Sequence, residues 1–498
     1  MPETSRRADD ELDFAIVGAG AAGTYLAYRL IQAQPDSRIA IFERSNRIGG
    51  RLWSVGVDGL TQPIELGGMR YMTGHALVQS VVSDLGIETR PFDTAQEPER
   101  LFLRGVVGAG PDDPAAGRGY DLPAGERGRS ANDLLGRAFL QIVAQARALD
   151  EEGWRQLRAT HMFGQRPLTD WSISEAVATV LSPAGYRFVT DAFGYDSGIR
   201  PHNAGDAIQY LVGTGYPSGA ARVPIAGMDR IPRDLAGRFK AAGGSVRLGH
   251  DVRRIQMDGG KTVLSFADGS GVRARRLVLT LPIPALEALA DASAVINGSI
   301  WRRLYGSVEG FPATKLYCWY NRPWWRDGRA APTGLRTTTD LPNRMIFYFD
   351  EAPERPAALL AAFTDTRNNE PIISRAGGRS GGAPASAGLL EAVTEWLQTA
   401  HPGAAVPAPI GSAFQHWGAD PREVAWHFWR AGVNSDETMA LAAQPDESLP
   451  IHLCGEVFSR HGAWVEGALE TAAALVERLV AERQPSSKPD AVSIGEAD

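Results

Sequence analysis

The chain has 498 residues, of which 44% are hydrophobic and 22% are charged, and its formal net charge at pH 7 is −7. This composition is typical of a folded protein of roughly two to four domains, and the excess of acidic residues argues against a nucleic-acid partner. No run of about 18 uncharged apolar residues is present, so we expect no membrane span.

The first predicted elements are a strand, a glycine-rich turn and a helix. Residues 14–17 are apolar and partly β-branched, which favours a buried strand, and residues 21–33 have apolar positions at helical spacing. Gly18 permits the tight turn, Gly20 allows a phosphate to approach the backbone, and Gly23 allows the helix to pack closely on the strand. The free N–H groups and the dipole at the start of the helix favour a pyrophosphate there.

A second predicted strand, residues 38–42, leads into Glu43, which lies 20 positions after Gly23. A carboxylate at this place accepts hydrogen bonds from both ribose hydroxyls of an adenosine. The strand, turn, helix and acid together predict a dinucleotide-binding unit and leave NAD and FAD open.

Similar β/α segments recur in the middle and at the end of the chain. Residues 227–257 and 261–282 predict a helix, a strand and a hairpin, and residues 450–483 predict a last strand and helix. We therefore expect an α/β fold in which a Rossmann-like domain, built from three separate segments, is interleaved with an α+β substrate domain and a helical insertion. The predicted boundaries are 12–75, 220–290 and 448–485 for the Rossmann-like domain, 76–132 and 291–447 for the substrate domain, 133–219 for the helical domain and 486–498 for a disordered tail.

Cysteine use and the first residues of the chain favour a cytoplasmic protein. The two cysteines, Cys318 and Cys454, form no disulfide or metal-binding pattern, and the nine histidines are scattered. The first residues contain no apolar core of the kind found in a secretory signal. We therefore expect a cytoplasmic location and no metal site.

Six further motifs resemble one family of flavoproteins. They are, in chain order, RIGGR (47–51), IELGGMRYM (64–72), HDVRRI (250–255), LVLTLPIPAL (277–286), KLYCWYNRPWW (315–325) and LCGEVFSRHGAWVEGALETA (453–472). Together they resemble the flavin-containing amine oxidases, the group that holds monoamine, polyamine and L-amino-acid oxidases. The resemblance implies that the glycine-rich turn binds the pyrophosphate of FAD and that the three-segment domain is an FAD-binding domain.

The resemblance also implies which charged side chains lie near the cofactor. Glu43 matches the acid that binds the ribose. Arg44 and Arg51 match basic residues near the adenosine and the pyrophosphate, although two arginines can also form a solvated surface pair. Glu456 matches the acid of the C-terminal motif, near the pyrophosphate and the ribityl chain.

Two backbone positions complete the implied cofactor site. Val252 matches the position whose backbone holds the adenine, and Val465 matches the contact at the pyrimidine edge of the flavin, at the start of the last helix. A helix N-terminus there stabilises negative charge on the reduced flavin. The full expected set of cofactor-binding residues is Gly18, Gly20, Ala22, Gly23, Glu43, Arg44, Gly50, Arg51, Gly68, Met69, Arg70, Val252, Glu456, Trp464 and Val465.

Three more residues match catalytic positions of the family. Lys315 matches a lysine that holds a water at flavin N5, although a lysine can also blunt an exposed strand edge. Trp426 and Trp464 match the pair that forms an aromatic wall beside the flavin, with Trp429 as a substitute for Trp426. Core packing is the commoner fate of a tryptophan, so these assignments have a structural alternative.

Arg70 indicates the class of substrate. L-amino-acid oxidases and amino-acid monooxygenases of this family carry arginine at the matching position, and its planar fork binds a carboxylate through two parallel hydrogen bonds. The alternative is a structural arginine that pairs with Glu65 or with a backbone carbonyl. Asp196 and Asp206 could meet a basic substrate side chain, but a surface position is the expected one for both.

The resemblance thus implies an FAD-dependent L-amino-acid oxidase. Such an enzyme converts an L-amino acid and oxygen to a 2-oxo acid, ammonia and hydrogen peroxide. Homodimers are common in the family, so the resemblance also implies a homodimer. The alternatives are an amino-acid 2-monooxygenase that yields an amide, an amine or polyamine oxidase, a C–C desaturase, and a flavin-binding protein without turnover.

Overall fold

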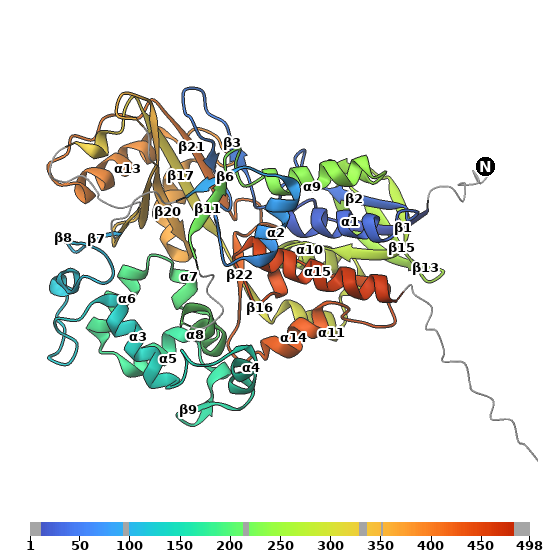
Figure 1. The fold of residues 1–498 in the computed structure, drawn as a ribbon, viewed down its shortest axis with the longest axis horizontal. Helices are drawn as coiled ribbons and strands as arrows, with labels where there is room; N and C mark the ends of the chain where they lie inside the picture. Colours follow the sequence, from blue (N-terminus) through green and yellow to red (C-terminus); the bar gives the residue numbers. More distant parts are fainter. Residues whose placement is uncertain (1–10, 93–98, 213–218, 328–335, 350–351, 483–498) are drawn as a thin grey trace, which may run out of the picture.

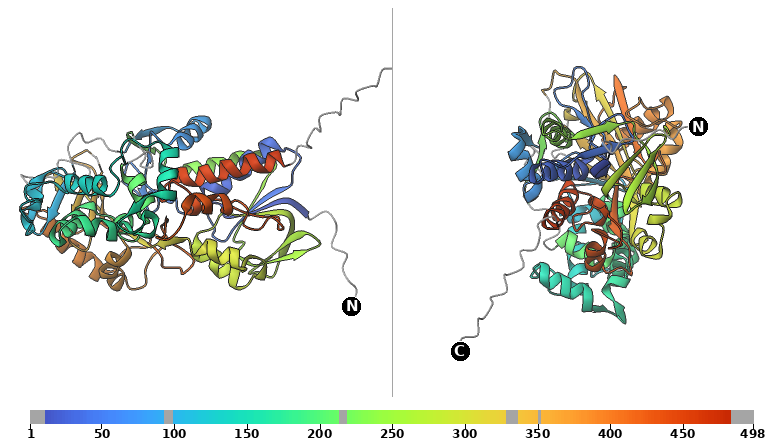
Figure 2. Two further views of the ribbon diagram at one scale, coloured as in Figure 1. Left: turned by 90° about the horizontal axis from the view of Figure 1, so that it is seen from below. Right: turned by 90° about the vertical axis from the view of Figure 1, so that its right-hand side faces the viewer.

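The computed structural model describes residues 11–92, 99–212, 219–327, 336–349 and 352–482. A sheet covered by helices forms one end of the elongated molecule, and a second sheet with a group of helices forms the other (Figure 1). The view from below in Figure 2 shows the same separation along the long axis. The predicted tail, 486–498, lies outside the described residues.

The first large sheet has the strand order β12-β2-β1-β15-β14-β13, and β23 also pairs with β15. Its strands are β1 (Glu11–Val17), β2 (Ile39–Glu43), β12 (Ser245–Leu248), β13 (Val252–Asp258), β14 (Lys261–Phe266), β15 (Gly271–Leu279) and β23 (Ile451–Leu453). Strands β12, β2, β1, β15 and β23 run parallel and come from three separate stretches of the chain. This arrangement confirms the predicted α/β fold with a three-segment Rossmann-like domain, whereas the exact domain boundaries stay predictions.

Alternation of side chains along β1 explains how helices cover both faces of this sheet. The helices are α1 (Ala21–Ala33), α2 (Ala76–Leu85), α9 (Arg230–Ala241), α10 (Ile283–Asp291), α11 (Ser299–Tyr305), α14 (Ser435–Ala442) and α15 (Val465–Ala481). Phe14 and Ile16 share a core with α1, α9 and α15. Ala15 and Val17 belong to a different core, which contains residues of α10 and α11. The central parallel strands are therefore buried on both sides, as is usual for parallel strands.

The second large sheet has the order β21-β17-β20-β19-β18-β7-β8. Its strands are β7 (Arg100–Leu103), β8 (Val106–Gly108), β17 (Ala313–Tyr320), β18 (Arg336–Thr339), β19 (Met345–Tyr348), β20 (Ala357–Asp365) and β21 (Gly411–Trp417), and α12 (Glu370–Ala376) and α13 (Ala387–Ala400) lie nearby. Leu316 and Cys318 of β17 pack in one core with residues of α12 and α13. Lys315 and Tyr317 alternate with them and therefore face the other side, toward the rest of the molecule.

A group of helices, the helical insertion, lies beside the second sheet (Figure 1, teal to green). It comprises α3 (Ala131–Ile142), α4 (Glu151–Thr160), α5 (Ile173–Val180), α6 (Pro183–Phe193), α7 (Asp196–Ile199) and α8 (Ala204–Val212). The side chains of Ser130, Asp150, Ser172 and Ser182 cap the first backbone N–H groups of α3, α4, α5 and α6, which is a favoured use of these residue types. The insertion has a hydrophobic core of its own.

Four small sheets of short strands complete the fold of the described residues. They are β3 (Ser54–Val55) with β4 (Ile64–Glu65), β5 (Tyr71–Met72) and β6 (Thr89–Pro91) with β11 (Ala221–Pro224), β9 (Met162–Phe163) with β10 (Arg166–Pro167), and β16 (Val308–Phe311) with β22 (Trp426–Trp429). Within the described ranges, no helix combines the length and the apolar character that a membrane span needs.

The contact between α1 and the glycine-rich turn leads to a stability prediction. A Cβ on Gly23 would lie 2.0 Å from the carbonyl oxygen of Gly18, whereas a Cβ on Gly237 in α9 would meet nothing within 4 Å. We expect Gly23→Ala to lower the free energy of unfolding by about 1–3 kcal/mol or more. The matched control Gly237→Ala should raise it by about 0.5–1 kcal/mol. Urea unfolding followed by circular dichroism measures both changes, and equal effects would contradict the close contact.

Candidate functional site

A cavity of about 730 Å³ extends from the glycine-rich turn to the second sheet. Its volume lies within the range of roughly 300–1,000 Å³ that is usual for ligand and cofactor sites. The structure brings together on its wall every predicted site residue except Gly23, which lies beneath the turn. These residues are Gly18, Gly20, Ala22, Glu43, Arg44, Gly50, Arg51, Gly68, Met69, Arg70, Val252, Lys315, Trp426, Glu456, Trp464 and Val465.

The glycine-rich turn forms an open cradle at one end of the cavity. Gly18 has a φ of 110°, which favours glycine. A Cβ on Gly20 would meet only the Cα of Gly50, at 3.9 Å, so the turn leaves room for a ligand. No side chain caps α1 at this end, so its first N–H groups remain suited to a phosphate.

Glu43 is fixed beside this turn by two backbone hydrogen bonds. The N–H of Ala19 donates to Oε2 at 3.0 Å, and the N–H of Ser45 donates to Oε1 at 2.9 Å. The carboxylate therefore lies at the carboxyl end of β2, next to the turn at the end of β1. This is the place where a ribose-binding acid is expected.

Arg51, which is half-buried, and Glu456, which is buried, form an ion pair in the wall of the cavity. Nη1 of Arg51 donates to Glu456 Oε2 at 2.6 Å. The carboxylate of Glu456 also accepts from the N–H and Nδ1 of His427 and from the N–H of Ala463. Burial alone would raise the pKa of Glu456, but Arg51, His427 and Ala463 together hold it well below its usual range. Both oxygens of the Glu456 carboxylate thus accept hydrogen bonds from protein groups. The role of Glu456 beside the ribityl chain stays a prediction.

Arg44 does not form a solvated pair with Arg51. Its Nη1 lies 2.6 Å from Asp420 Oδ2, and its Nη2 donates to Glu423. These partners follow Arg44 by more than 370 positions in the sequence, so the ion pairs join the first and last parts of the cavity wall.

Lys315 is buried, and β17 lies between β20 and β21 inside the second sheet, so the alternative of an edge lysine is wrong. Its Nζ donates to the carbonyl oxygens of Gly67 at 2.5 Å and Glu65 at 3.1 Å and lies 4.9 Å from the ring centroid of Phe363. Burial lowers the pKa of Lys315 and raises the pKa of the neighbouring Glu65. The amine is therefore easier to deprotonate than that of a surface lysine.

Arg70 lines the cavity with its guanidinium carbon 5.3 Å from the ring centroid of Phe92. The structural alternative of a pair with Glu65 is not formed, because the carboxylate of Glu65 accepts from Ser54 Oγ at 2.8 Å and from the N–H of Met228 at 2.9 Å. Among the described residues, the structure gives the guanidinium of Arg70 no hydrogen bond and no ion pair. Its donors are thus available to a ligand.

Two tryptophans face the cavity, and a hydroxyl group from the helical insertion accepts from each. Nε1 of Trp426 donates to Ser197 Oγ at 2.9 Å, and Nε1 of Trp464 donates to Tyr210 Oη at 2.6 Å. Trp429, the substitute considered from the sequence, donates instead to the carbonyl oxygen of Ser459 and does not line this cavity.

Sequence reasoning missed several residues of the cavity wall. Tyr195, Ser197 and Tyr210 come from the helical insertion, and Phe363 is the cross-strand neighbour of Lys315. No local motif marks these positions, because strand pairing and the docking of the insertion bring them to the site. Only the pattern of paired strands could have indicated Phe363.

The carboxylates that line the cavity differ from Arg70, because each has a protein partner. Glu43 and Glu456 accept the bonds described above, Asp251 pairs with Arg422 at 3.0 Å, and Glu423 pairs with Arg44. Within the described ranges, no group of three His, Cys, Asp or Glu side chains is placed to hold a metal ion. Among the described residues of the wall, Arg70 therefore has no charged partner, whereas each carboxylate has a protein partner.

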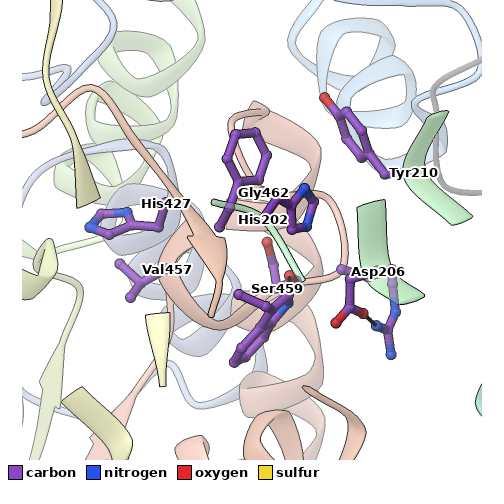
Figure 3. Close-up of a pocket in the computed structure, with 10 residues that line it drawn as sticks. His202, Asp206, Tyr210, His427, Val457, Ser459 and Gly462 are labelled. Carbon is purple, nitrogen blue, oxygen red and sulfur yellow. Dashed lines mark hydrogen bonds and ion pairs between the residues drawn. The ribbon is translucent and has the colours of Figure 1, made fainter. Parts of the chain in front are cut away.

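The expectation of surface positions for Asp196 and Asp206 is wrong, because both are buried. Asp196 lies near Arg200 and Arg367, and Asp206 accepts from Arg460 at 2.7 Å. Figure 3 shows Asp206 with His202 and Tyr210 around a second, small cavity. Its volume of about 10 Å³ suits a single water molecule. Neither aspartate lines the main cavity, so neither is placed to meet a substrate there.

Known proteins resemble this chain in sequence and in fold. It is 26% identical to aplysianin-A of Aplysia kurodai over 94% of this chain and 90% of that protein. It is 23% identical to L-amino acid oxidase Bs29 of Bothriechis schlegelii over 70% of this chain and 67% of that protein. A double mutant of putrescine oxidase has a similar fold, with a TM-score of 0.72 at 17% identity over 95% of this chain and 99% of that chain.

The predicted cytoplasmic location is wrong. Aplysianin-A and the snake L-amino acid oxidase are secreted proteins, which points away from the cytoplasm. The prediction depended on the lack of an apolar core in the first residues and on the small number of cysteines, and Cys318 and Cys454 are both buried and unpaired. Buried thiols without a partner are inert packing groups and carry no information about the compartment.

The family resemblance inferred from the six motifs is confirmed. The sequence profile of the flavin containing amine oxidoreductases matches residues 21–480, which begin at α1, directly after the glycine-rich turn, and include the second sheet and nearly all of the last helix. The prediction of FAD as the cofactor is confirmed with it. The chain belongs to the family of flavin-containing amine oxidoreductases.

Proposed function

We propose that the protein is an L-amino-acid oxidase that uses FAD to deaminate an L-amino acid. The observation that carries this proposal is Arg70, a guanidinium on the cavity wall for which the described residues provide an aromatic face and no anion. A planar fork without a partner suits a carboxylate, which accepts two parallel hydrogen bonds from it. The similarity to a snake L-amino acid oxidase supports the same activity.

The residues of the cavity fit FAD. The open cradle at Gly20, the uncapped start of α1 and Glu43 suit the pyrophosphate and the adenosine ribose. Val252 and Val465 would hold the adenine and the pyrimidine edge through their backbone, as the family resemblance implies. When bound, the flavin supplies the two-electron oxidant that takes a hydride from the substrate.

The remaining site residues orient the substrate and exclude water. Arg70 would bind the substrate carboxylate, and the faces of Trp426 and Trp464 would flank the neutral amine. Lys315 would hold a water molecule beside the flavin, because its buried amine already lies at the boundary between the second sheet and the cavity. No side-chain base is required in this arrangement, since the amine can enter in its neutral form.

The charge of the cavity wall disfavours a polyamine oxidase. A substrate with two or more ammonium groups needs carboxylates that can accept from it, and each carboxylate in the described wall already has a protein partner. The likeness to putrescine oxidase is a likeness of fold at 17% identity.

A peroxide assay with the twenty common L-amino acids tests the proposal. We expect at least one amino acid to give hydrogen peroxide, ammonia and the 2-oxo acid in equal amounts. Release of carbon dioxide with an amide would instead indicate the amino-acid 2-monooxygenase alternative. Absence of flavin reduction by any amino acid or amine would indicate a binding protein without turnover.

The flavin should be bound without a covalent bond. Cys318 and Cys454 are buried, and neither lines the cavity. We expect purified protein to be yellow and acid precipitation to leave the colour in the supernatant. Colour that stays with the washed precipitate would show this prediction to be wrong.

Lys315→Met should affect the reaction with oxygen more than the reaction with substrate. A positive group near the flavin favours electron transfer to oxygen, and methionine removes the charge but keeps most of the volume. We expect oxidation of the reduced enzyme by oxygen to slow by on the order of 10- to 100-fold, with a smaller effect on reduction. Stopped-flow absorbance measures both half-reactions, and equal slowing would contradict this role.

Arg70→Ala should remove the preference for substrates with a carboxylate. The loss of one partner of a partly buried ion pair costs about 3–5 kcal/mol, which is on the order of 100- to 5,000-fold in kcat/KM. Arg70→Lys should recover part of this loss, because an ammonium group cannot offer two parallel donors. The measurement is kcat/KM for an amino acid and for the corresponding decarboxylated amine.

The control for this variant is Arg166→Ala, which removes an arginine stacked on Trp171 outside the cavity. We expect the control to leave kcat/KM unchanged and both variants to keep their flavin. If Arg70→Ala loses flavin or unfolds at a lower temperature while activity per bound flavin stays intact, Arg70 is a structural residue.

A further inference from the structure

A short chain of hydrogen bonds leads from the cavity into the protein interior at Trp426. The indole Nε1 donates to Ser197 Oγ at 2.9 Å, and Ser197 Oγ donates to Asp365 Oδ2 at 2.5 Å. Ser197 and Asp365 are each 1% exposed. Ser197 belongs to α7 of the helical insertion, Asp365 ends β20, and Trp426 begins β22, so three distant segments meet here.

The direction of each hydrogen bond in this chain is fixed. Burial raises the pKa of Asp365 to about 6, so its carboxylate is mainly ionised at neutral pH. It accepts from the N–H groups of Asp196 and Ser197, both at 3.0 Å, as well as from the Ser197 hydroxyl. Because an ionised carboxylate only accepts, the single hydroxyl hydrogen of Ser197 must point to Asp365. A lone pair of Ser197 Oγ is then left for the indole N–H, which can only donate.

Packing by itself does not set the orientation of this tryptophan. The rings of Tyr195 and Phe363 stand nearly perpendicular to Trp426, with centroids 6.3 Å from it in both cases. Such contacts locate the ring, but the torsion about the Cβ–Cγ bond is broad and two-fold. The bond to Ser197 decides which edge of the indole faces the interior and therefore how its plane meets the cavity.

We propose that Ser197 and Asp365 are positioning residues that fix the plane of Trp426 as one wall of the substrate site. The proposal rests on the proposed function only in treating that wall as part of a site for an amine or amino acid. The helical insertion then has a defined task at the site, because its α7 supplies the hydroxyl that orients an aromatic ring of another segment.

The first test observes the indole N–H directly and needs no turnover. In protein labelled with ¹⁵N-tryptophan, the resonance of Trp426 is the one that Trp426→Phe removes. We expect Ser197→Ala to move this resonance upfield and to make its hydrogen exchange faster with solvent, with or without bound flavin. An unchanged resonance and exchange rate would overturn the proposal, because the indole would then not depend on the hydroxyl.

The second test is a double-mutant cycle on the limiting rate of flavin reduction. It uses whichever substrate the wild type oxidises, amino acid or amine, so failure of the cycle is distinct from failure of the amino-acid assignment. We expect Ser197→Ala to slow reduction roughly five- to tenfold in the wild type, the effect of losing one neutral hydrogen bond. In the Trp426→Phe background, the same change should alter the rate less than about twofold. The substrate Kd should stay constant, because Arg70 is intact.

One control variant and one replacement variant separate this role from a general effect on folding. Ser293→Ala removes another buried serine, whose Oγ accepts from the N–H of Ile255 at 2.9 Å outside the cavity, and should not change the reduction rate. If Ser197→Ala does not retain flavin, Asp365→Asn replaces it in the cycle. It weakens the acceptor of the Ser197 hydroxyl hydrogen and should give the same dependence on Trp426. An effect of equal size in the Trp426 and Phe backgrounds would overturn the proposal and indicate that Ser197 acts on the substrate or on α7 alone.

Discussion

The parallel register of the first sheet is the constraint on which the rest of the site depends. Backbone pairing places Phe42, Val17, Leu279 and Leu453 in one row across β2, β1, β15 and β23. The residues that follow this row, among them Gly18 and Glu43, therefore emerge at the same edge. Ligands bind at the carboxyl ends of the strands in open α/β sheets, and a dinucleotide cofactor needs its groups presented along such an edge. Three distant segments of the chain must fold together before this edge exists.

Ion pairs and hydrogen bonds then fix the side chains around that edge. Arg51 with Glu456, and Arg44 with Asp420 and Glu423, join the start of the chain to its last quarter. Removal of Arg51 would be costly because the buried charge of Glu456 would lose its arginine partner. The same reasoning makes Arg70 informative. In a cavity whose carboxylates have protein partners, this arginine against an aromatic ring is the group that we propose to bind an anionic group of the substrate.

The sequence predicted those parts of the site that are local in the chain. The glycine-rich turn and Glu43 could be recognised because spacing within one βα unit decides their geometry. The segment around Gly50 and the start of α15 could be recognised because their motifs resemble those of the family. The partners of Arg44, the position of Phe363 and the hydroxyl groups at Trp426 and Trp464 could not, because tertiary packing decides them. Asp196 and Asp206 look like surface residues in a helical pattern, yet arginines from other segments allow their burial. The roles of the individual site residues stay predictions until the variants are measured.

The most direct measurement of the central claim is anaerobic mixing of the wild-type protein with an L-amino acid and, separately, with the amine that its decarboxylation would give. Absorbance of the oxidised flavin reports on reduction without any contribution from oxygen. We expect amino acids to bleach this absorbance rapidly and the matched amines to do so far more slowly, because only the amino acids carry a carboxylate for Arg70. Faster bleaching by the amines would contradict the proposed role of Arg70 and identify the protein as an amine oxidase.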